Sequence, residues 1–253
     1  MTNRAPAVAE LREQPAMAPG TNFVEPAEGE SQADDDLFGA VLTETVAALD
    51  RAQVRYVFMG GIGAATHGRP RWTHDIDVFV RPEEAERALR VLAHVGFRTE
   101  KTFPDWLYKA FKHDVMVDVI FQSVGGILLD EEMLERAQVE DFRGHRLRIM
   151  APEDLLVIKA IVHDEHTPRH WHDALALVSR CELDWDYLVR RARRHGARRV
   201  LSLLLYAQSN DLVVPAGPVR ALFDEVFTDW PAPPGPPGSR APQPPREPAR
   251  ERA

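Results

Sequence analysis

The spacing of apolar residues divides the chain into a first part rich in strands and a second part made of helices. Apolar residues at helical spacing predict a helix over Leu37–Ala52, after the acidic run Asp34–Asp36. Stretches of β-branched and aromatic residues predict strands over Arg55–Met59, Asp75–Val80, Leu107–Lys112 and Val115–Phe121, and a hairpin over Asp141–Met150. Further helices are predicted over Pro82–His94, Pro152–Asp164, Pro168–Arg180, Asp184–His195 and Ala197–Gln208.

Both ends of the chain differ in composition from its middle. Residues 1–35 are rich in Ala, Pro, Glu and Gly with few large apolar side chains, so this segment is predicted to be a disordered acidic tail. Half of the residues in Pro231–Pro248 are proline, which predicts a disordered tail over 230–253. The remaining residues are predicted to form a core over 36–150 and a helical domain over 151–229.

Charge and cysteine content exclude few functions. The net charge is −8, but residues 1–36 hold eight acids against two bases, so the core is only slightly acidic and a local basic surface is still possible. A single cysteine, Cys181, cannot form an internal disulfide. No apolar stretch approaches the roughly 20 residues of a membrane helix, and no secretory signal is apparent. We therefore expect a cytoplasmic protein.

Three aspartates occupy strand positions at which apolar residues are usual. Asp75 and Asp77 are two residues apart in one predicted strand, so both point to the same face, about 6.6 Å apart along the chain. Asp118 lies among apolar residues of a later strand. Carboxylates grouped in a half-buried strand repel one another and lose hydration, so cations must accompany them. If the two strands are neighbours, the three acids form an oxygen site suited to Mg²⁺ or Mn²⁺.

Each of the three aspartates also has a purely structural interpretation, without a metal ion. Asp75 and Asp77 would then pair with basic side chains, for which the candidates are Arg69, Arg71 and Lys159. Asp118 would lie at a surface edge of the sheet.

The glycine pair and the three acids resemble a known superfamily. Gly60–Gly61, then Thr73-His74-Asp75-Ile76-Asp77-Val78, then Asp118 in a later strand are similar to the polymerase-β-type nucleotidyltransferases. The resemblance covers about residues 37–180 and is closest to small bacterial nucleotidyltransferase-like proteins, which include AbiEii-type toxins and some antibiotic nucleotidyltransferases. With the strand and helix pattern, it predicts an α/β (α+β) fold: a mixed twisted sheet flanked by helices, followed by a C-terminal helical bundle.

The resemblance also implies roles for these residues. Asp75 and Asp77 would hold the metal ions, Asp118 would complete the site and aid the attacking group, and Gly60–Gly61 would meet the nucleotide phosphates. A Gly-Gly turn that opens a helix offers backbone N–H groups to an anion. Many members have Gly-Ser here, so Gly61 lacks a hydroxyl that would contact a phosphate.

Other polar residues are candidates for nucleotide binding. Arg69 and Arg71 flank the strand that begins after Thr73, and they either hold phosphates or neutralise the acids. Lys159 lies on the apolar side of its predicted helix, so its ammonium group must either extend to solvent or pair with an acidic side chain. Similarity to related helical segments implies that Lys159, Arg169 and Asp173 face the strand carboxylates and that Lys159 binds triphosphate. The alternative for Asp173 is a buried partner of Lys159 or Arg169.

Two further clusters suggest rival functions. His163, His166, His170 and His172, with Asp164 and Asp173, are compatible with a metallohydrolase site, although Pro168 is expected to start a new helix after an N-cap at Thr167. Six arginines between Arg190 and Arg199 form either a solvated helical face or a surface for RNA.

The pattern favours Mg²⁺-dependent transfer of a nucleoside monophosphate from an NTP to a hydroxyl group, with release of pyrophosphate. The acceptor would be a tRNA end, a protein side chain or a small molecule. The alternative is an inactive nucleotide-binding module of the same fold, such as one half of a toxin–antitoxin pair with a partner protein.

Overall fold

The computed structural model describes residues 28–68, 71–164 and 168–228, with side chains from residue 35 onward. The chain divides into a unit of residues 1–36 and a unit of residues 37–253. Of the first unit, residues 28–36 are described, and they are helical. All that follows concerns the second unit, which contains the whole sheet.

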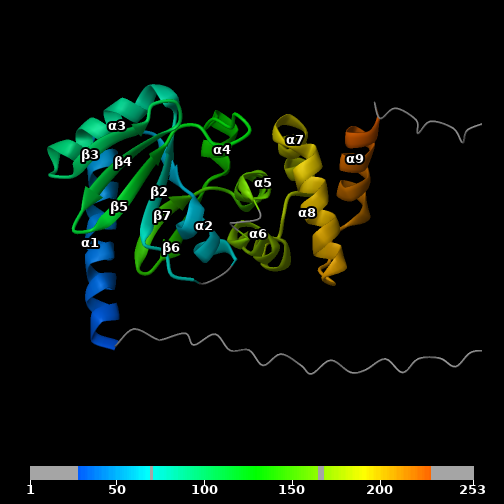
Figure 1. Ribbon diagram of the computed structural model, residues 1–253, viewed down its shortest axis with the longest axis horizontal. Coiled ribbons are helices and arrows are strands. Elements are labelled where there is room, and N and C mark those ends of the chain that lie inside the picture. The colour runs from blue at the N-terminus through cyan, green and yellow to red at the C-terminus, as the bar shows by residue number, and fades with distance from the viewer. Residues whose placement is uncertain (1–27, 69–70, 165–167, 229–253) are drawn as a thin grey trace, which may run out of the picture. The chain divides into compact units, whose positions relative to one another are not determined.

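The second unit is built on one mixed sheet of seven strands in the order β3-β4-β5-β2-β1-β7-β6 (Figure 1). The strands are β1 (Tyr56–Phe58), β2 (Asp75–Val80), β3 (Arg98–Phe103), β4 (Leu107–Lys112), β5 (Val115–Ile120), β6 (Gln138–Phe142) and β7 (His145–Ile149). Strand β2 runs parallel to β5, and β1 runs parallel to β7. The remaining pairs are antiparallel. The predicted α/β class with a mixed sheet is confirmed.

Alternation along the strands gives the sheet two different faces. Ile76, Val78 and Val80 of β2 pack in a core with α1 (Glu28–Arg51, here from Phe38 on) and α3 (Pro82–His94). Phe79, whose side chain points the other way, belongs to the core of the C-terminal helices. Since side chains alternate along a strand, Asp75 and Asp77 share the face of Phe79.

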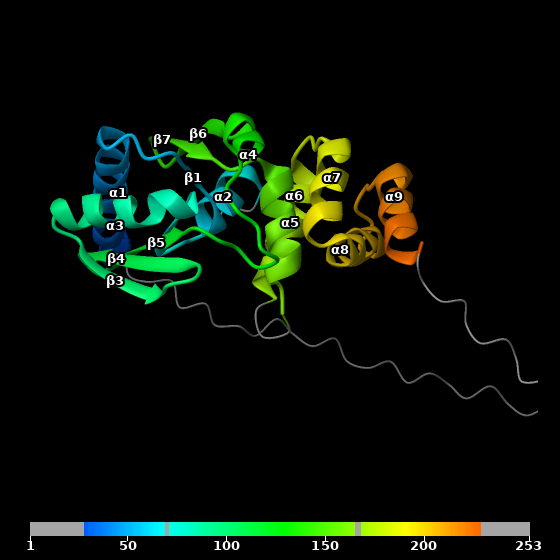
Figure 2. The ribbon, with the colours of Figure 1, turned by 90° about the horizontal axis from the view of Figure 1, so that it is seen from above.

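The rest of the described chain adds one helix before β6 and a run of helices after β7. Its helices are α4 (Glu131–Arg136), which precedes β6, and α5 (Pro152–Val162), α6 (Arg169–Arg180), α7 (Trp185–His195), α8 (Ala197–Ser209) and α9 (Ala216–Phe227). Of the helices after β7, both ribbon views place α5 and α6 nearest the sheet and α9 farthest from it (Figure 2). Among the described residues, none of the helices combines the length and the apolar character needed to cross a membrane.

The arginine run of α7 is mostly ion-paired within the chain. Arg191 is buried and pairs with Asp130 and Asp154, at 2.5 and 2.7 Å. Arg190, Arg193 and Arg194 also lie within 4 Å of acidic side chains. Arg191 is thus a buried ion-pair residue. The exposed Arg190, Arg193 and Arg194 favour the solvated-face interpretation of the run over an RNA surface, because neighbouring acids already balance their charge.

Several elements depart from the sequence prediction. The first helix begins at Glu28 and not near Leu37, because the acidic residues 28–36 suit a helix N-terminus. Strand β3, α4 and α9 were not predicted. β3 lacks an apolar alternation because it is an exposed edge strand. Helix α6 has its N-cap at Pro168. Thr167, most of both predicted tails and Arg69 lie outside the described residues, and the division at residue 150 stays a prediction.

Candidate active site

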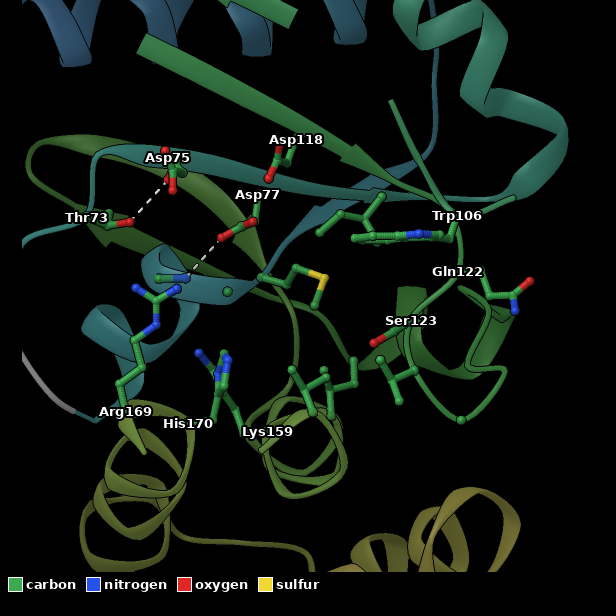
Figure 3. Close-up of a pocket in the computed structure, with 18 of the residues that line it drawn as sticks. Thr73, Asp75, Asp77, Trp106, Asp118, Gln122, Ser123, Lys159, Arg169 and His170 are labelled. Atoms are coloured by element: carbon green, nitrogen blue, oxygen red, sulfur yellow. Dashed lines mark hydrogen bonds between the residues drawn. The ribbon is translucent and has the colours of Figure 1, made fainter. Parts of the chain in front are cut away.

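The three aspartates lie side by side on one face of the sheet (Figure 3). Parallel pairing of β2 with β5 places Asp77 directly opposite Asp118, and Asp75 lies two residues earlier on β2. All three line a single cavity of about 480 Å³. The neighbouring strands and the shared face therefore agree with the arrangement predicted from the sequence.

Asp77 is held beside the start of α2 (Gly60–His67). Its carboxylate accepts a hydrogen bond of 3.2 Å from the N–H of Gly61. Burial raises the pKa of Asp77 to about 6; the Gly61 bond opposes the rise, whereas the charges of Asp118 and Asp75 add to it. The carboxylate therefore lies among like charges, a situation that a bound cation would relieve.

Asp118 has a cationic partner that sequence reasoning missed. Lys109 of β4 lies opposite Asp118 in the antiparallel pair, and its Nζ is 2.8 Å from the carboxylate. Burial raises the pKa of Asp118, and the bond from Lys109 works against that rise. Lys109 alternates with buried residues in β4, which is the pattern that would have placed it on this face.

The glycine pair fits closely around the acids. Gly60 has φ of +54°, a left-handed conformation, and a Cβ there would overlap the carboxylate of Asp77. A Cβ on Gly61 would overlap the Oγ1 of Thr73. Thr73 is buried, and its hydroxyl donates to the backbone oxygen of Asp75 at 3.2 Å. The Thr73 hydroxyl therefore lies next to the position that a serine side chain at residue 61 would occupy.

A buried ion network forms the opposite wall. Asp173 of α6 receives Lys159 Nζ at 2.9 Å and two bonds from the Arg71 guanidinium at 3.1 and 3.2 Å. The side chains of Lys159 and Asp173 are 5% and 0% exposed. Burial lowers the pKa of Lys159, although Asp173 offsets part of this. Burial opposes ionisation of Asp173 too, but both cations outweigh it and its pKa is lowered.

This network corrects one alternative considered for the acids. Among the described residues, the ion-pair partner of Arg71 and of Lys159 is Asp173, and neither cation is bonded to Asp75 or Asp77. Arg169 and His170, at the start of α6, line the same cavity. Burial, with the charges of Lys159 and Arg169, lowers the pKa of His170 to about 4, so this imidazole is neutral at pH 7.

The histidine cluster does not form a second centre in the described part of the chain. His163 stacks on Trp171, with ring centroids 4.5 Å apart, whereas His170 lines the cavity of the acids. His172 is exposed, and His166 lies outside the described residues. Across residues 35–68, 71–164 and 168–228, no three His, Cys, Asp or Glu side chains are already arranged to hold a metal ion.

The fit between Gly61 and Thr73 gives a testable prediction. Changing Gly61 to Ala should lower the melting temperature, because the new methyl group displaces the Thr73 side chain. In the double variant Gly61→Ala, Thr73→Gly, the space is restored and the melting temperature should recover in part. Thermal unfolding followed by circular dichroism measures this, and equal loss in the single and double variants would contradict it.

The raised pKa of Asp77 predicts a pH dependence of metal binding. A metal ligand must be deprotonated, so Mn²⁺ affinity should be full above about pH 7 and should fall as pH drops through about 6. Titration of Mn²⁺ followed by electron paramagnetic resonance at several pH values measures this. An affinity that stays constant down to pH 5 would contradict it.

Comparisons with known proteins place the chain in a family. Residues 25–209 match the family model described as "uncharacterised nucleotidyltransferase". That match spans well over half of the sequence, so the chain belongs to this nucleotidyltransferase family, as the glycine pair and the three acids indicated. No curated protein sequence matches the chain.

Solved structures with a similar fold include enzymes that modify antibiotics. ANT(2″)-Ia in complex with adenylyl-2″-tobramycin is 18% identical and is matched over 68% of this chain and 97% of that chain, with a TM-score of 0.44. The lincosamide antibiotic adenylyltransferase LnuA, bound to lincomycin, is 14% identical over 55% and 96%, with a TM-score of 0.42. A putative nucleotidyltransferase from Thermotoga maritima is 16% identical over 52% and 83%, with a TM-score of 0.36.

Proposed function

We propose that this nucleotidyltransferase moves a nucleoside monophosphate from an NTP to a hydroxyl group of a small molecule and releases pyrophosphate. The observation that carries the proposal is the single cavity lined by Asp75, Asp77 and Asp118 on one wall and by Lys159 and Gly61 on others. Such a cavity combines carboxylates for divalent cations with donors for phosphate oxygens. We place the reaction in the cytoplasm, where NTPs are available.

The donor set of the cavity fits Mg²⁺ or Mn²⁺. Asp75 and Asp77 offer oxygen ligands. Burial raises the pKa of Asp77 and the charges of Asp118 and Asp75 add to the rise, and a divalent ion would remove this repulsion. Mg²⁺ is commonly held by one or two carboxylates together with substrate phosphates, so a complete protein cage is not required before the NTP binds. The bound ion would neutralise charge on the reacting phosphate and on the departing pyrophosphate.

The residues of the chain itself would bind the phosphates. Helix α2 starts at Gly60, where backbone N–H groups and the positive end of the helix dipole favour an anion. Lys159, oriented by Asp173, adds a fixed charge beside them. Arg169, exposed at the rim, adds a second charge. Thr73 would offer the hydroxyl that Gly61 lacks.

Asp118 would accept the proton of the attacking hydroxyl. Its pKa is raised by burial, which makes it a better base than an exposed carboxylate, and Lys109 stabilises its charged form. As the acceptor oxygen forms its bond to the α-phosphorus, the proton passes to Asp118. The bond from that phosphorus to the bridging oxygen breaks, and pyrophosphate leaves with the electron pair.

The ion pairing of the arginines in α7 favours a small-molecule acceptor over RNA. Arg190, Arg191, Arg193 and Arg194 are paired with acids of this chain, which leaves little unbalanced charge for a phosphate backbone. A tRNA end and a protein side chain are the competing acceptors.

One labelling experiment tests the proposal. The protein is incubated with each α-³²P-labelled NTP, Mg²⁺ and, separately, small metabolites and antibiotics, total tRNA, or cell protein. We expect label in the small-molecule fraction and pyrophosphate in equal amount. Label in tRNA or protein would overturn the acceptor class, and tight NTP binding without any transfer would favour an inactive nucleotide-binding module.

A further inference from the structure

The cavity of the acids continues past Asp118 into an end that the phosphate-binding residues do not use. This indole end is lined by Asp105, Trp106, Ile120, Gln122 and Ser123. Figure 3 shows Lys159, Arg169 and His170 across the cavity from the three aspartates, with Trp106 to one side of both groups. The cavity therefore has a charged end, where the acids face the basic side chains, and an aromatic end.

Trp106 is built as a platform at this end. Its backbone N–H donates to the oxygen of Phe103 at 3.1 Å, and its own oxygen accepts from the N–H of Phe121 at 3.0 Å. The indole stacks on the Phe103 ring, with centroids 5.2 Å apart and planes 15° from parallel. In Figure 3 the indole is seen nearly edge-on beside the cavity. Phe103 backs the indole, and Trp106, not Phe103, lines the cavity.

The platform is open to a ligand. The Trp106 side chain remains 41% exposed although it is the largest aromatic residue of the cavity. Among the described residues of this end, Asp105 is the one charged side chain, and Gln122 contributes an amide that both donates and accepts hydrogen bonds. An uncharged, planar, aromatic group with polar edges fits this chemistry.

We propose that the base of the NTP stacks on Trp106, with the Gln122 amide at the edge of the base. The proposal rests on the proposed function, which sets the phosphates between the three acids and the Lys159 and Arg169 side chains that face them. The nucleoside must then extend along the rest of the cavity, toward the indole. The bicyclic indole overlaps a purine more completely than a pyrimidine, so the geometry favours a purine NTP.

The strand supplies a path of suitable length for the nucleoside. Asp118 and Ile120 are alternate residues of β5, so they follow one another on one face at a step of about 7 Å, and Gln122 lies two residues beyond the end of the strand. The sugar would lie over Ile120, between the acid and the amide. Val162 lies one helical turn after Ile158 on α5, and both residues line the cavity as an apolar surface for the nucleoside.

The experiment separates the base from the phosphates by measuring binding without turnover. Calorimetry in the presence of Mg²⁺ measures the affinity of two ligands. The first is an adenosine triphosphate analogue that carries a methylene group between the α- and β-phosphorus. The second is inorganic tripolyphosphate, which has no base. The variants are Trp106→Ala and Trp106→Phe, and Phe223→Ala on α9 is the control because it removes a half-exposed aromatic ring remote from the cavity lining.

We expect Trp106→Ala to weaken the adenosine analogue about tenfold and to leave tripolyphosphate unchanged. Trp106→Phe should restore most of the loss, and Phe223→Ala should match the wild type. If Trp106→Ala lowers the affinity for both ligands equally, or for neither, the stacking proposal is wrong. If the affinity for the analogue is unchanged but the KM for the acceptor rises, the indole binds the acceptor instead of the base. Failure of the wild type to bind either ligand would overturn the proposed function as well.

Discussion

Replacing Asp77 by Asn is expected to reduce nucleotidyl transfer at least ~1000-fold while the protein stays folded. The amide keeps the size of the side chain but removes a ligand charge, and a loss of ~4 kcal/mol in transition-state stabilisation corresponds to this factor. The melting temperature at pH 7.5 should be equal or higher, because the variant no longer buries a carboxylate whose pKa is raised to about 6. Label transfer and thermal unfolding measure the two effects.

The matched control is Asp114→Asn. Asp114 lies in the exposed turn between β4 and β5 with φ of +63°, a conformation that Asn adopts readily, so both activity and stability should be unchanged. The Asp77 variant also has a signature in pH. A raised pKa in the folded state makes stability fall as pH rises from about 4 to about 6, and Asp77→Asn should flatten this fall by up to ~2 kcal/mol. Transfer activity that survives in Asp77→Asn would remove the carboxylates from the mechanism.

Replacing Asp173 by Leu is expected to produce the largest loss of stability, about 3–5 kcal/mol in the free energy of unfolding. The substitution leaves Lys159 buried without its carboxylate and releases Arg71 as well. Urea unfolding followed by fluorescence measures the effect. Because its pKa is already lowered by burial, Lys159 is expected to lose its proton more easily in this variant.

A second variant separates packing from phosphate binding. Asp173→Leu, Lys159→Met replaces the buried pair by apolar side chains and should recover most of the lost stability. It should not recover NTP affinity, because the cation at the cavity wall is gone. If the double variant binds NTP as the wild type does, Lys159 has only a structural role. If the single variant is as stable as the wild type, the ion network contributes nothing to folding.

Much of the sheet followed from local patterns. The strands at Asp75–Val80 and Leu107–Lys112 have the expected bounds, and the strand from Val115 ends one residue earlier than expected, at Ile120. The hairpin turn at His113–Asp114 has positive φ at both residues. The same alternation predicted that Asp75 and Asp77 share a face. Strand β3 escaped prediction because only tertiary pairing with β4 makes Arg98–Phe103 a strand.

The remainder of the site depended on contacts distant in sequence. Lys109 reaches Asp118 through antiparallel pairing, and Asp173 joins Arg71 from 102 positions away. The sequence indicated that Lys159, on the apolar side of its helix, must either extend its charged end to solvent or pair with an acid, but it did not decide between the two. Trp106 had no motif at all, since its importance comes from its place at the end of the cavity and from the ring of Phe103 behind it.

The two-faced sheet has a consequence for dissecting the protein. On the face of the acids, Val57, Met59 and Phe79 are covered by the same apolar core as Leu155 and Leu177 of the later helices. A fragment that stops at Met150 would uncover these side chains and leave Arg71 without its carboxylate. Such a fragment would aggregate on expression, so the catalytic half is best studied within the intact chain.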